Sequence, residues 1–192
     1  MFAENLTNDE VNDLPLSHFG GGIFVIDTFD KLDYYLPLIQ EHKILGFDTE
    51  TRPSFKKGVI NPVSLLQISS STQAFLLRIN KIGLPDEIKN ILSDKNVKKI
   101  GLAIKDDIKI LKNINDFEPN SFFDLQDIVG DYGIEARSLK KITAIVLDKR
   151  ISKSQQVTNW EREVLTDAQL VYAATDAWAC LEVYKKINNE SK

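Results

Sequence analysis

The chain has 192 residues, of which 43% are hydrophobic and 27% charged, and this composition fits one globular domain with a full core. Its formal charge of −4 and isoelectric point near 5.3 argue against binding of nucleic acid by bulk positive charge, although they leave room for local basic patches. The single cysteine, Cys180, cannot form an internal disulfide, and it argues against redox chemistry or a cysteine-based metal site.

The N-terminal segment, residues 1–22, is polar and ends in three glycines, so we expect a flexible arm without regular structure. It lacks the basic and apolar regions of a signal peptide, and no apolar run approaches the roughly 18 residues of a membrane span. We therefore expect a soluble, cytoplasmic protein without a membrane partner. The oligomeric state is left open.

Residues 23–192 are expected to form one α/β domain. Strands are predicted at 23–27, 44–50, 63–69, 73–79, 97–103 and 122–124, and helices at 28–41, 85–92, 125–132, 139–147 and 167–187, with another beginning at Asp106 and Asp107. Three of the early strands are joined by connections too short for a crossover helix, so the sheet should be mixed.

The strand at 44–50 organises the expected site. Its apolar run stops at Asp48 and Glu50, and residues two apart in a strand point to the same face, so their carboxylates should lie side by side. Two like charges that close repel unless they are neutralised, and a divalent cation is the usual solution. The alternative is an ordinary strand that runs into a polar loop, where acidic residues are common.

The helix at 167–187 carries Tyr172 and Asp176, which project from the same face because they are four residues apart. Asp176 stands among alanines, and a charge in such a closely packing surface is costly if it is buried unpaired. It must therefore reach solvent or meet a cation. If this helix packs against the strand at 44–50, Asp48, Glu50 and Asp176 converge.

Asp107 is the natural fourth member of such a group, since it stands at the start of a helix that follows a strand. Simple capping also explains Asp106 and Asp107, because the helix dipole favours acidic residues in the first turn. The sequence alone leaves both interpretations open.

Four carboxylates without histidine or cysteine suit the hard cations Mg²⁺ and Mn²⁺, which favour phosphate substrates. Two such ions about 4 Å apart can activate a water on one side of a phosphodiester and stabilise the leaving oxygen on the other. Tyr172 would then orient the water rather than act as the base, since the ordinary pKa of tyrosine, near 10, is too high.

Three motifs in order give the chain a family resemblance. They are Phe-Asp-Thr-Glu at 47–50, Gly-Leu-Ala-Ile-Lys-Asp-Asp at 101–107 and Tyr-Ala-Ala-Thr-Asp-Ala at 172–177. Over about residues 23–187, the chain resembles the tyrosine-containing branch of the DEDD exonuclease superfamily, and within it the domains similar to RNase D and the Werner-syndrome exonuclease. The motif Tyr-x-x-x-Asp is weak by itself, but three motifs at suitable separations are strong.

The resemblance implies a ribonuclease-H-like fold, which is a mixed β-sheet flanked by α-helices, and a 3′-5′ exonuclease domain over residues 23–192. It implies hydrolysis of nucleic acid from a free 3′ end, release of nucleoside monophosphates, and two ions of Mg²⁺ or Mn²⁺. The implied metal ligands are Asp48, Glu50, Asp107 and Asp176, with Asp48 shared between the ions, Tyr172 as a further catalytic residue, Thr49 and Glu50 as contacts of the 3′-hydroxyl, and Asp124 as a structural residue.

Two departures from the family pattern bear on the site. Ala103 stands where many relatives have Asn or His, which loosens the register of the second motif, although the spacing favours Asp107 over Asp106. After the tryptophan, relatives often have Arg-Pro-Leu, whereas this chain has Glu-Val-Leu at 163–165. A substrate contact is therefore missing or is supplied by Arg162.

Two basic connections are expected to border the site, at 51–62 and 149–159. Their positive side chains either follow a phosphate backbone or are ordinary solvated loop charges. These residues are Lys56, Lys57, Lys149, Arg150 and Lys153.

Two other functions are weighed against a nuclease. An aspartate-nucleophile phosphatase also carries an aspartate after a strand, but it usually has Asp where Glu50 stands and leaves Tyr172 and Asp176 unexplained. A catalytically silent nucleic-acid-binding or adaptor module is the second alternative, although it has little reason to keep repulsive carboxylates together. The chain shows no recognisable reader of the 2′-hydroxyl, and only the Werner-type resemblance tilts the expected substrate slightly toward DNA.

Overall fold

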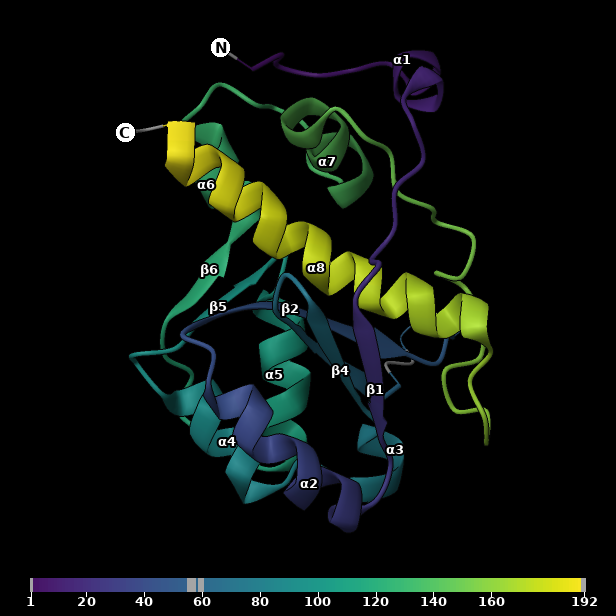
Figure 1. Ribbon diagram of the computed structural model, residues 1–192, viewed down its shortest axis with the longest axis vertical. Coiled ribbons are helices and arrows are strands. Elements are labelled where there is room, and N and C mark those ends of the chain that lie inside the picture. The colour runs from purple at the N-terminus through teal and green to yellow at the C-terminus, as the bar shows by residue number, and fades with distance from the viewer. Residues whose placement is uncertain (1, 55–57, 59–60, 191–192) are drawn as a thin grey trace.

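The computed structural model describes residues 2–54, 58 and 61–190. They form one six-stranded β-sheet with helices packed around it (Figure 1). The strands are β1 (Gly22–Ile26), β2 (Ile44–Thr51), β3 (Val63–Ser69), β4 (Gln73–Leu77), β5 (Lys98–Gly101) and β6 (Phe122–Asp124). The helices are α1 (Asn8–Asp13), α2 (Phe29–Gln40), α3 (Ile79–Ile82), α4 (Asp86–Ser93), α5 (Lys105–Ile114), α6 (Leu125–Gly130), α7 (Leu139–Leu147) and α8 (Asp167–Glu190).

The sheet is mixed, as the short connections between early strands predicted. Its order is β1-β4-β3-β2-β5-β6, in which β3 pairs antiparallel with both β2 and β4. The remaining pairs, β1 with β4, β2 with β5 and β5 with β6, are parallel. Strand β2 therefore lies inside the sheet, where it bonds to a neighbour on each side.

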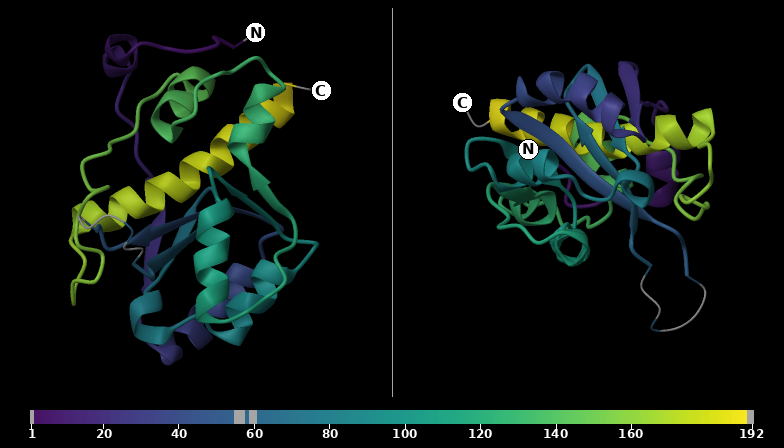
Figure 2. Two further views of the ribbon diagram at one scale, coloured as in Figure 1. Left: turned by 180° about the vertical axis from the view of Figure 1, so that it is seen from behind. Right: turned by 90° about the horizontal axis from the view of Figure 1, so that it is seen from below.

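Helices cover both faces of this sheet. Helices α2, α4 and α5 share a core cluster with Leu45 and Phe47, whereas α6, α7 and α8 share another with Ile100. Figure 1 shows the long α8 crossing the molecule beside α6 and α7, with α2, α3 and α4 grouped at the other end. From behind, α5 runs from the middle of the molecule toward that second group (Figure 2). The two helical layers bury residues 45–47 of β2 from both faces, whereas the residues from Asp48 onward are partly exposed.

Gly46 lets α8 lie directly on β2. Side chains alternate along a strand, so Gly46 and Asp48 face α8 while Phe47 faces the opposite helical layer. A Cβ atom at Gly46 would stand 1.9 Å from the carbonyl oxygen of Ala177, a clash with the helix backbone itself. The alanine-rich face of α8 can therefore approach the strand as closely as the sequence suggested.

The segment 1–22 does contain regular structure, so that part of the expectation is wrong. Thr7 caps α1 in a capping box, in which its side chain accepts a hydrogen bond from the Glu10 backbone and the Glu10 side chain accepts one in return. Val11, in the middle of this helix, is fully buried. The polar residues that suggested a loose chain thus include the signal that starts a helix.

The segment after α1 docks on the domain through long-range contacts. The Ser17 amide donates to the Arg150 carbonyl oxygen at 2.8 Å, and the Phe19 amide donates to Thr175 Oγ1 at 3.0 Å. The Phe19 ring is buried against Trp178 of α8. Such contacts join residues more than 130 positions apart, and no local sequence pattern could reveal them.

The other elements agree with expectation apart from their ends. The side chains of Thr28, Ser138 and Thr166 cap α2, α7 and α8. The strand expected at 73–79 ends at Leu77, and the short helix α3 follows it. No helix within the described ranges is both long and apolar enough to cross a membrane.

The close contact at Gly46 predicts a specific packing defect. Gly46→Ala should destabilise the protein by about 1–3 kcal/mol or more, the usual scale of overpacking, because the rigid backbone of α8 must move. Gly130→Ala is the matched control, since a Cβ atom there meets no atom within 4 Å. Thermal unfolding followed by circular dichroism measures both variants, and an equal melting temperature for the two would contradict this role of Gly46.

Candidate active site

Carboxylates from β2 and α8 meet in one cluster. Asp48, Glu50 and Asp176 each offer an oxygen, and these three oxygens lie within 4.8 Å of one another. The β2 strand delivers the first two on one face, and the close packing of α8 at Gly46 brings in the third. The convergence predicted from the sequence is therefore present in the structure.

Asp107 lies next to this cluster through a hydrogen bond from Thr49. Thr49 stands between Asp48 and Glu50 in the sequence, and its hydroxyl donates to Asp107 Oδ1 in the first turn of α5. Asp106 is exposed and lines a separate surface groove with Lys109 and Ile110. The geometry thus favours Asp107 as the residue of the second motif that faces the site.

Asp124 supports the start of α5 rather than the cluster. Its carboxylate accepts hydrogen bonds from the backbone amides of Ala103 at 2.9 Å and Ile104 at 3.1 Å, and it also caps α6. Ala103 has a φ of 55°, a left-handed conformation that is unusual for alanine. Asp124 thereby fixes the turn that presents Asp107, which agrees with the structural role implied for it.

Burial and mutual repulsion raise the pKa values of the carboxyl groups in the cluster. Burial raises the pKa of Asp48 well above its ordinary value, and the neighbouring charges of Asp176 and Asp107 raise it further. Burial also raises the pKa of Glu50 to about 10, with Asp48 as the next cause. The pKa of Asp176 is raised by burial, against the opposing charge of Lys153. Without a cation, Glu50 therefore holds its proton at neutral pH.

Tyr172 is buried beside the cluster, where its ring packs against Trp160 at a centroid distance of 6.0 Å. Burial raises the pKa of the Tyr172 hydroxyl above its ordinary value of 10, and the charges of Asp176 and Glu50 add to this effect. The hydroxyl therefore stays protonated at neutral pH and can donate a hydrogen bond. Trp160 is fully buried, so packing, rather than stacking on a base, is its role here.

Lys153 reaches the cluster from the connection between α7 and α8. Its Nζ lies 3.3 Å from Asp176 Oδ2 and 5.7 Å from the centroid of the Tyr172 ring. Asp176 Oδ1 is buried and has no hydrogen-bond partner among the described residues. One oxygen of this carboxylate is thus paired with an ammonium, and the other is available.

The other basic residues divide between two situations. Arg150 donates from Nε to the Leu14 carbonyl oxygen at 3.0 Å, so it holds the N-terminal segment. Lys149 and Arg162 are exposed. Lys56 and Lys57 lie outside the residues that the structure describes.

Gln67 is a site neighbour to which sequence reasoning gave no role. It pairs with Asp48 in the register of β2 and β3, and it is fully buried. Neither Gln67 Nε2 nor Gln67 Oε1 has a hydrogen-bond partner within the described residues. The available signal was an amide inside the buried run of β3, where a polar group needs a reason. Cys180 lines the same small pocket as Asp48, Glu50 and Asp176, and burial raises the pKa of its thiol.

The cluster fits a hard divalent cation. Its three side chains supply only oxygen, their like charges are unfavourable in a buried site, and Asp176 Oδ1 lacks a partner among the described residues. Carboxylates without histidine suit Mg²⁺ or Mn²⁺ better than the softer transition metals. The acidic cluster is therefore consistent with metal binding.

The mixed six-stranded sheet with helices on both faces is the ribonuclease-H-like exonuclease fold. Among solved structures, Escherichia coli RNase D, described as an exoribonuclease involved in structured RNA processing, superposes with a TM-score of 0.78 at 22% identity, over 88% of this chain and 45% of that one. The Aedes aegypti Nibbler EXO domain gives a TM-score of 0.75 at 23% identity and covers 87% of each chain.

The chain belongs to the 3′-5′ exonuclease family, whose sequence pattern matches residues 23–192. It is 32% identical over 158 residues to the Mus musculus bifunctional 3′-5′ exonuclease/ATP-dependent helicase WRN, covering 79% of this chain and 11% of that protein. It is 30% identical over 203 residues to an Arabidopsis thaliana 3′-5′ exonuclease, covering 96% of this chain and 69% of that protein. The chain thus spans only a small part of the first relative and about two thirds of the second.

The raised pKa of Glu50 predicts how stability depends on pH without metal. The unfolded carboxyl titrates near its ordinary value of 4.5 and the folded one near 10, so the stability from the protonated form is present below pH 4.5 and is lost as pH rises toward 10. The free energy of unfolding of the metal-free protein should fall between pH 5 and 9, by at most about 1.4 kcal/mol per pH unit for each proton, and its melting temperature should fall with it. Glu50→Gln should flatten this decline.

The control for this prediction is Glu118→Gln, which alters an exposed carboxylate outside the cluster. Calorimetric scans at each pH, with a chelator present, compare both variants with the parent. Identical slopes for Glu50→Gln and the parent would contradict the prediction.

Proposed function

We propose that this protein is a metal-dependent 3′-5′ exonuclease that hydrolyses phosphodiester bonds from the 3′ end of nucleic acid and releases nucleoside monophosphates by a two-metal-ion mechanism. The observation that carries the proposal is the meeting of Asp48, Glu50 and Asp176 from two elements far apart in sequence. Membership of the 3′-5′ exonuclease family supports the same reaction.

Two Mg²⁺ or Mn²⁺ ions would be held by the carboxylates of this site. Asp48, Glu50 and Asp176 would hold one of them, and Asp48 together with Asp107 the other. When bound, such ions make a water nucleophilic at neutral pH and stabilise the leaving oxygen of the phosphodiester. Glu50, whose pKa is raised to about 10 in the metal-free cluster, must release its proton as the ions bind.

Tyr172 would orient the attacking water through its hydroxyl. Its raised pKa excludes it as the general base at neutral pH, but a protonated hydroxyl can hold a water in place by hydrogen bonding. Packing against Trp160 fixes the ring at the edge of the cluster. Tyr172 thereby supplies orientation rather than proton abstraction.

Thr49 and Glu50 would contact the terminal 3′-hydroxyl, so that the site acts on an end rather than within a strand. Thr49 lies between the two β2 carboxylates, and its hydroxyl already donates to Asp107. The 3′ end of a nucleic acid bound there would lie between β2 and the start of α5. The proposed specificity for ends therefore depends on the same short segment that carries the metal ligands.

DNA is proposed as the substrate slightly ahead of RNA. The mouse relative is named as an exonuclease joined to a helicase, and its sequence is more similar to this chain than that of RNase D. Escherichia coli RNase D is described as an exoribonuclease, and its likeness to this chain supports the fold alone. Parallel assays on both nucleic acids decide between them.

Substitution of the cluster should abolish the reaction. Asp48→Ala and Asp176→Ala each remove a charge that the transition state needs, so activity should fall by at least about a hundredfold. The assay uses 3′-directed digestion of 5′-labelled single-stranded DNA, recessed duplex DNA and RNA of matched sequence, with Mg²⁺ or Mn²⁺. If no substrate shortens from its 3′ end, or if both variants match the parent, the proposed function fails.

A cation titration separates an active enzyme from a silent module. Ligands that bind only the folded state raise its melting temperature, so Mn²⁺ should stabilise the parent and have much less effect on Asp48→Ala. A silent nucleic-acid-binding or adaptor module would bind nucleic acid without this response. A covalent aspartyl-phosphate on Asp48 would instead indicate a phosphatase.

The neighbouring residues Asp106 and Asp107 provide a matched pair. Asp107→Asn should lower the rate by about tenfold to a hundredfold, the scale on which loss of a residue supporting a metal site is felt. Asp106→Asn changes the same charge one position away, on an exposed side chain that faces another groove. Equal losses in the two variants, measured as initial rates at saturating Mn²⁺, would contradict the choice of Asp107.

A further inference from the structure

Lys153 contributes positive charge to an otherwise acidic pocket. The pocket measures about 170 Å³, and the cluster carboxylates, Thr49, Gln156 and Tyr172 contribute to its walls. Within the part of the chain that the structure describes, Lys153 is the only basic side chain among its lining residues. Its ammonium lies 3.3 Å from Asp176 Oδ2, so it sits on one of the groups that would hold a metal ion.

The pair differs from an ordinary surface salt bridge because its acidic partner is buried. The side chain of Asp176 is 4% exposed, whereas that of Lys153 is 31% exposed. A buried carboxylate left without a partner is strongly unfavourable, and removal of the cation from such a pair is usually destabilising. Lys153, by contrast, can return its ammonium to water at little cost because it already lies at the mouth of the pocket.

The backbone around Lys153 is held by hydrogen bonds to either side. Three residues earlier, the Arg150 amide donates to the Pro15 carbonyl oxygen at 3.1 Å, and the Arg150 carbonyl accepts from Ser17. One residue to either side, the hydroxyls of Ser152 and Ser154 are 3.0 Å apart. The long, partly exposed side chain of Lys153 thus extends into the pocket from a backbone that is held in place.

A divalent cation and this ammonium cannot both be accommodated without cost. Both are attracted by the same carboxylates, and they repel each other at short range. Because Asp176 Oδ1 has no hydrogen-bond partner among the described residues, a cation has a free oxygen at which to arrive before the ammonium leaves Oδ2.

We propose that Lys153 is a built-in counter-ion of the acidic cluster, which pairs with Asp176 in the metal-free protein and is displaced from it when a divalent cation binds. The proposal rests on the proposed function, since it requires the cluster to bind such a cation. It assigns Lys153 two measurable effects: it stabilises the metal-free fold, and it weakens cation binding.

The test removes the charge with little change in side-chain length. In chelator, Lys153→Met should lower the melting temperature by roughly 2–4 °C, as expected for loss of one moderate interaction in a protein of this size. In calorimetric titrations with Mn²⁺, it should bind about tenfold more tightly than the parent, because a unit charge no longer opposes a divalent ion nearby. Lys153→Arg keeps the charge and should bind Mn²⁺ much as the parent does.

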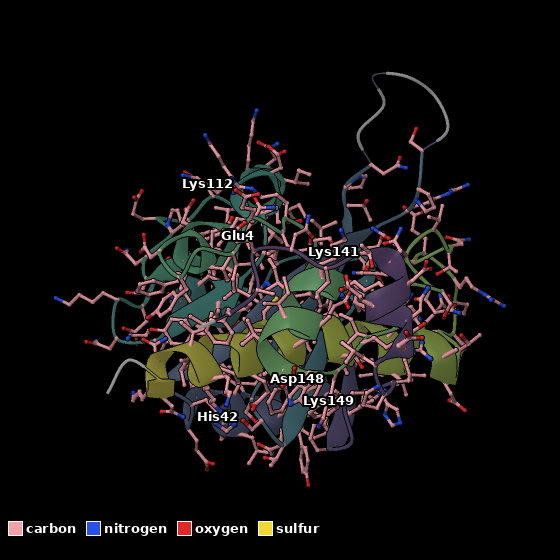
Figure 3. The ribbon with its side chains drawn as sticks, turned by 90° about the horizontal axis from the view of Figure 1, so that it is seen from above. Glu4, His42, Lys112, Lys141, Asp148 and Lys149 are labelled. Atoms are coloured by element: carbon pink, nitrogen blue, oxygen red, sulfur yellow. The ribbon has the colours of Figure 1, made fainter. Side chains whose placement is uncertain are left out.

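Lys149→Met is the matched control, because it removes the same charge from an exposed position in the same connection, next to Asp148 (Figure 3). It should leave Mn²⁺ affinity and the metal-free melting temperature near those of the parent. If it tightens binding as much as Lys153→Met does, the effect is one of net charge and the proposal fails. Should the methionine variant not fold, Lys153→Gln carries out the same comparison.

The outcomes also separate this proposal from the proposed function. A parent that binds Mn²⁺, together with a Lys153→Met variant that binds no more tightly or is no less stable in chelator, overturns the counter-ion role alone. A parent and a variant that both fail to bind Mn²⁺ overturn the proposed function along with it.

Discussion

The contact between α8 and β2 is the constraint on which the site depends. Gly46 has no side chain to separate the strand from the Ala177 backbone. Because the two elements touch there, Asp176, one residue earlier in α8, is held against the carboxyl-bearing end of β2. A wider spacing would leave the same acidic residues in the sequence and no common site in the molecule.

That contact also creates an electrostatic problem that the surroundings resolve only in part. Buried like charges are unfavourable, and the raised pKa values of Asp48 and Glu50 express this. Lys153 offsets part of the charge, while a fully buried amide, Gln67, lies beside Asp48 without a hydrogen-bond partner among the described residues. Such a cluster is well suited to bind cations, because a bound cation would relieve the repulsion between the buried carboxylates.

Much of this could be predicted from the sequence because local rules and short motifs govern it. The cluster was predicted from two sequence features, the spacing of Asp48 and Glu50 in a strand and the alanines around Asp176. What could not be predicted depends on long-range contacts. The pairing of Lys153 with Asp176 requires knowledge of how a loop returns to the helix. The spacing of the second motif already favoured Asp107 over Asp106, and the Thr49 hydrogen bond supports that choice.

The docked N-terminal segment has a further consequence for where the catalytic unit begins. The family match starts at residue 23, yet residues before it hold Arg150 by backbone hydrogen bonds, and Arg150 precedes the lysine at the mouth of the pocket by only three positions. The family match thus leaves out residues that help to hold the connection carrying Lys153. Substitutions around Pro15 and Ser17, which carry no catalytic group, would therefore act first on the backbone of the connection that presents Lys153.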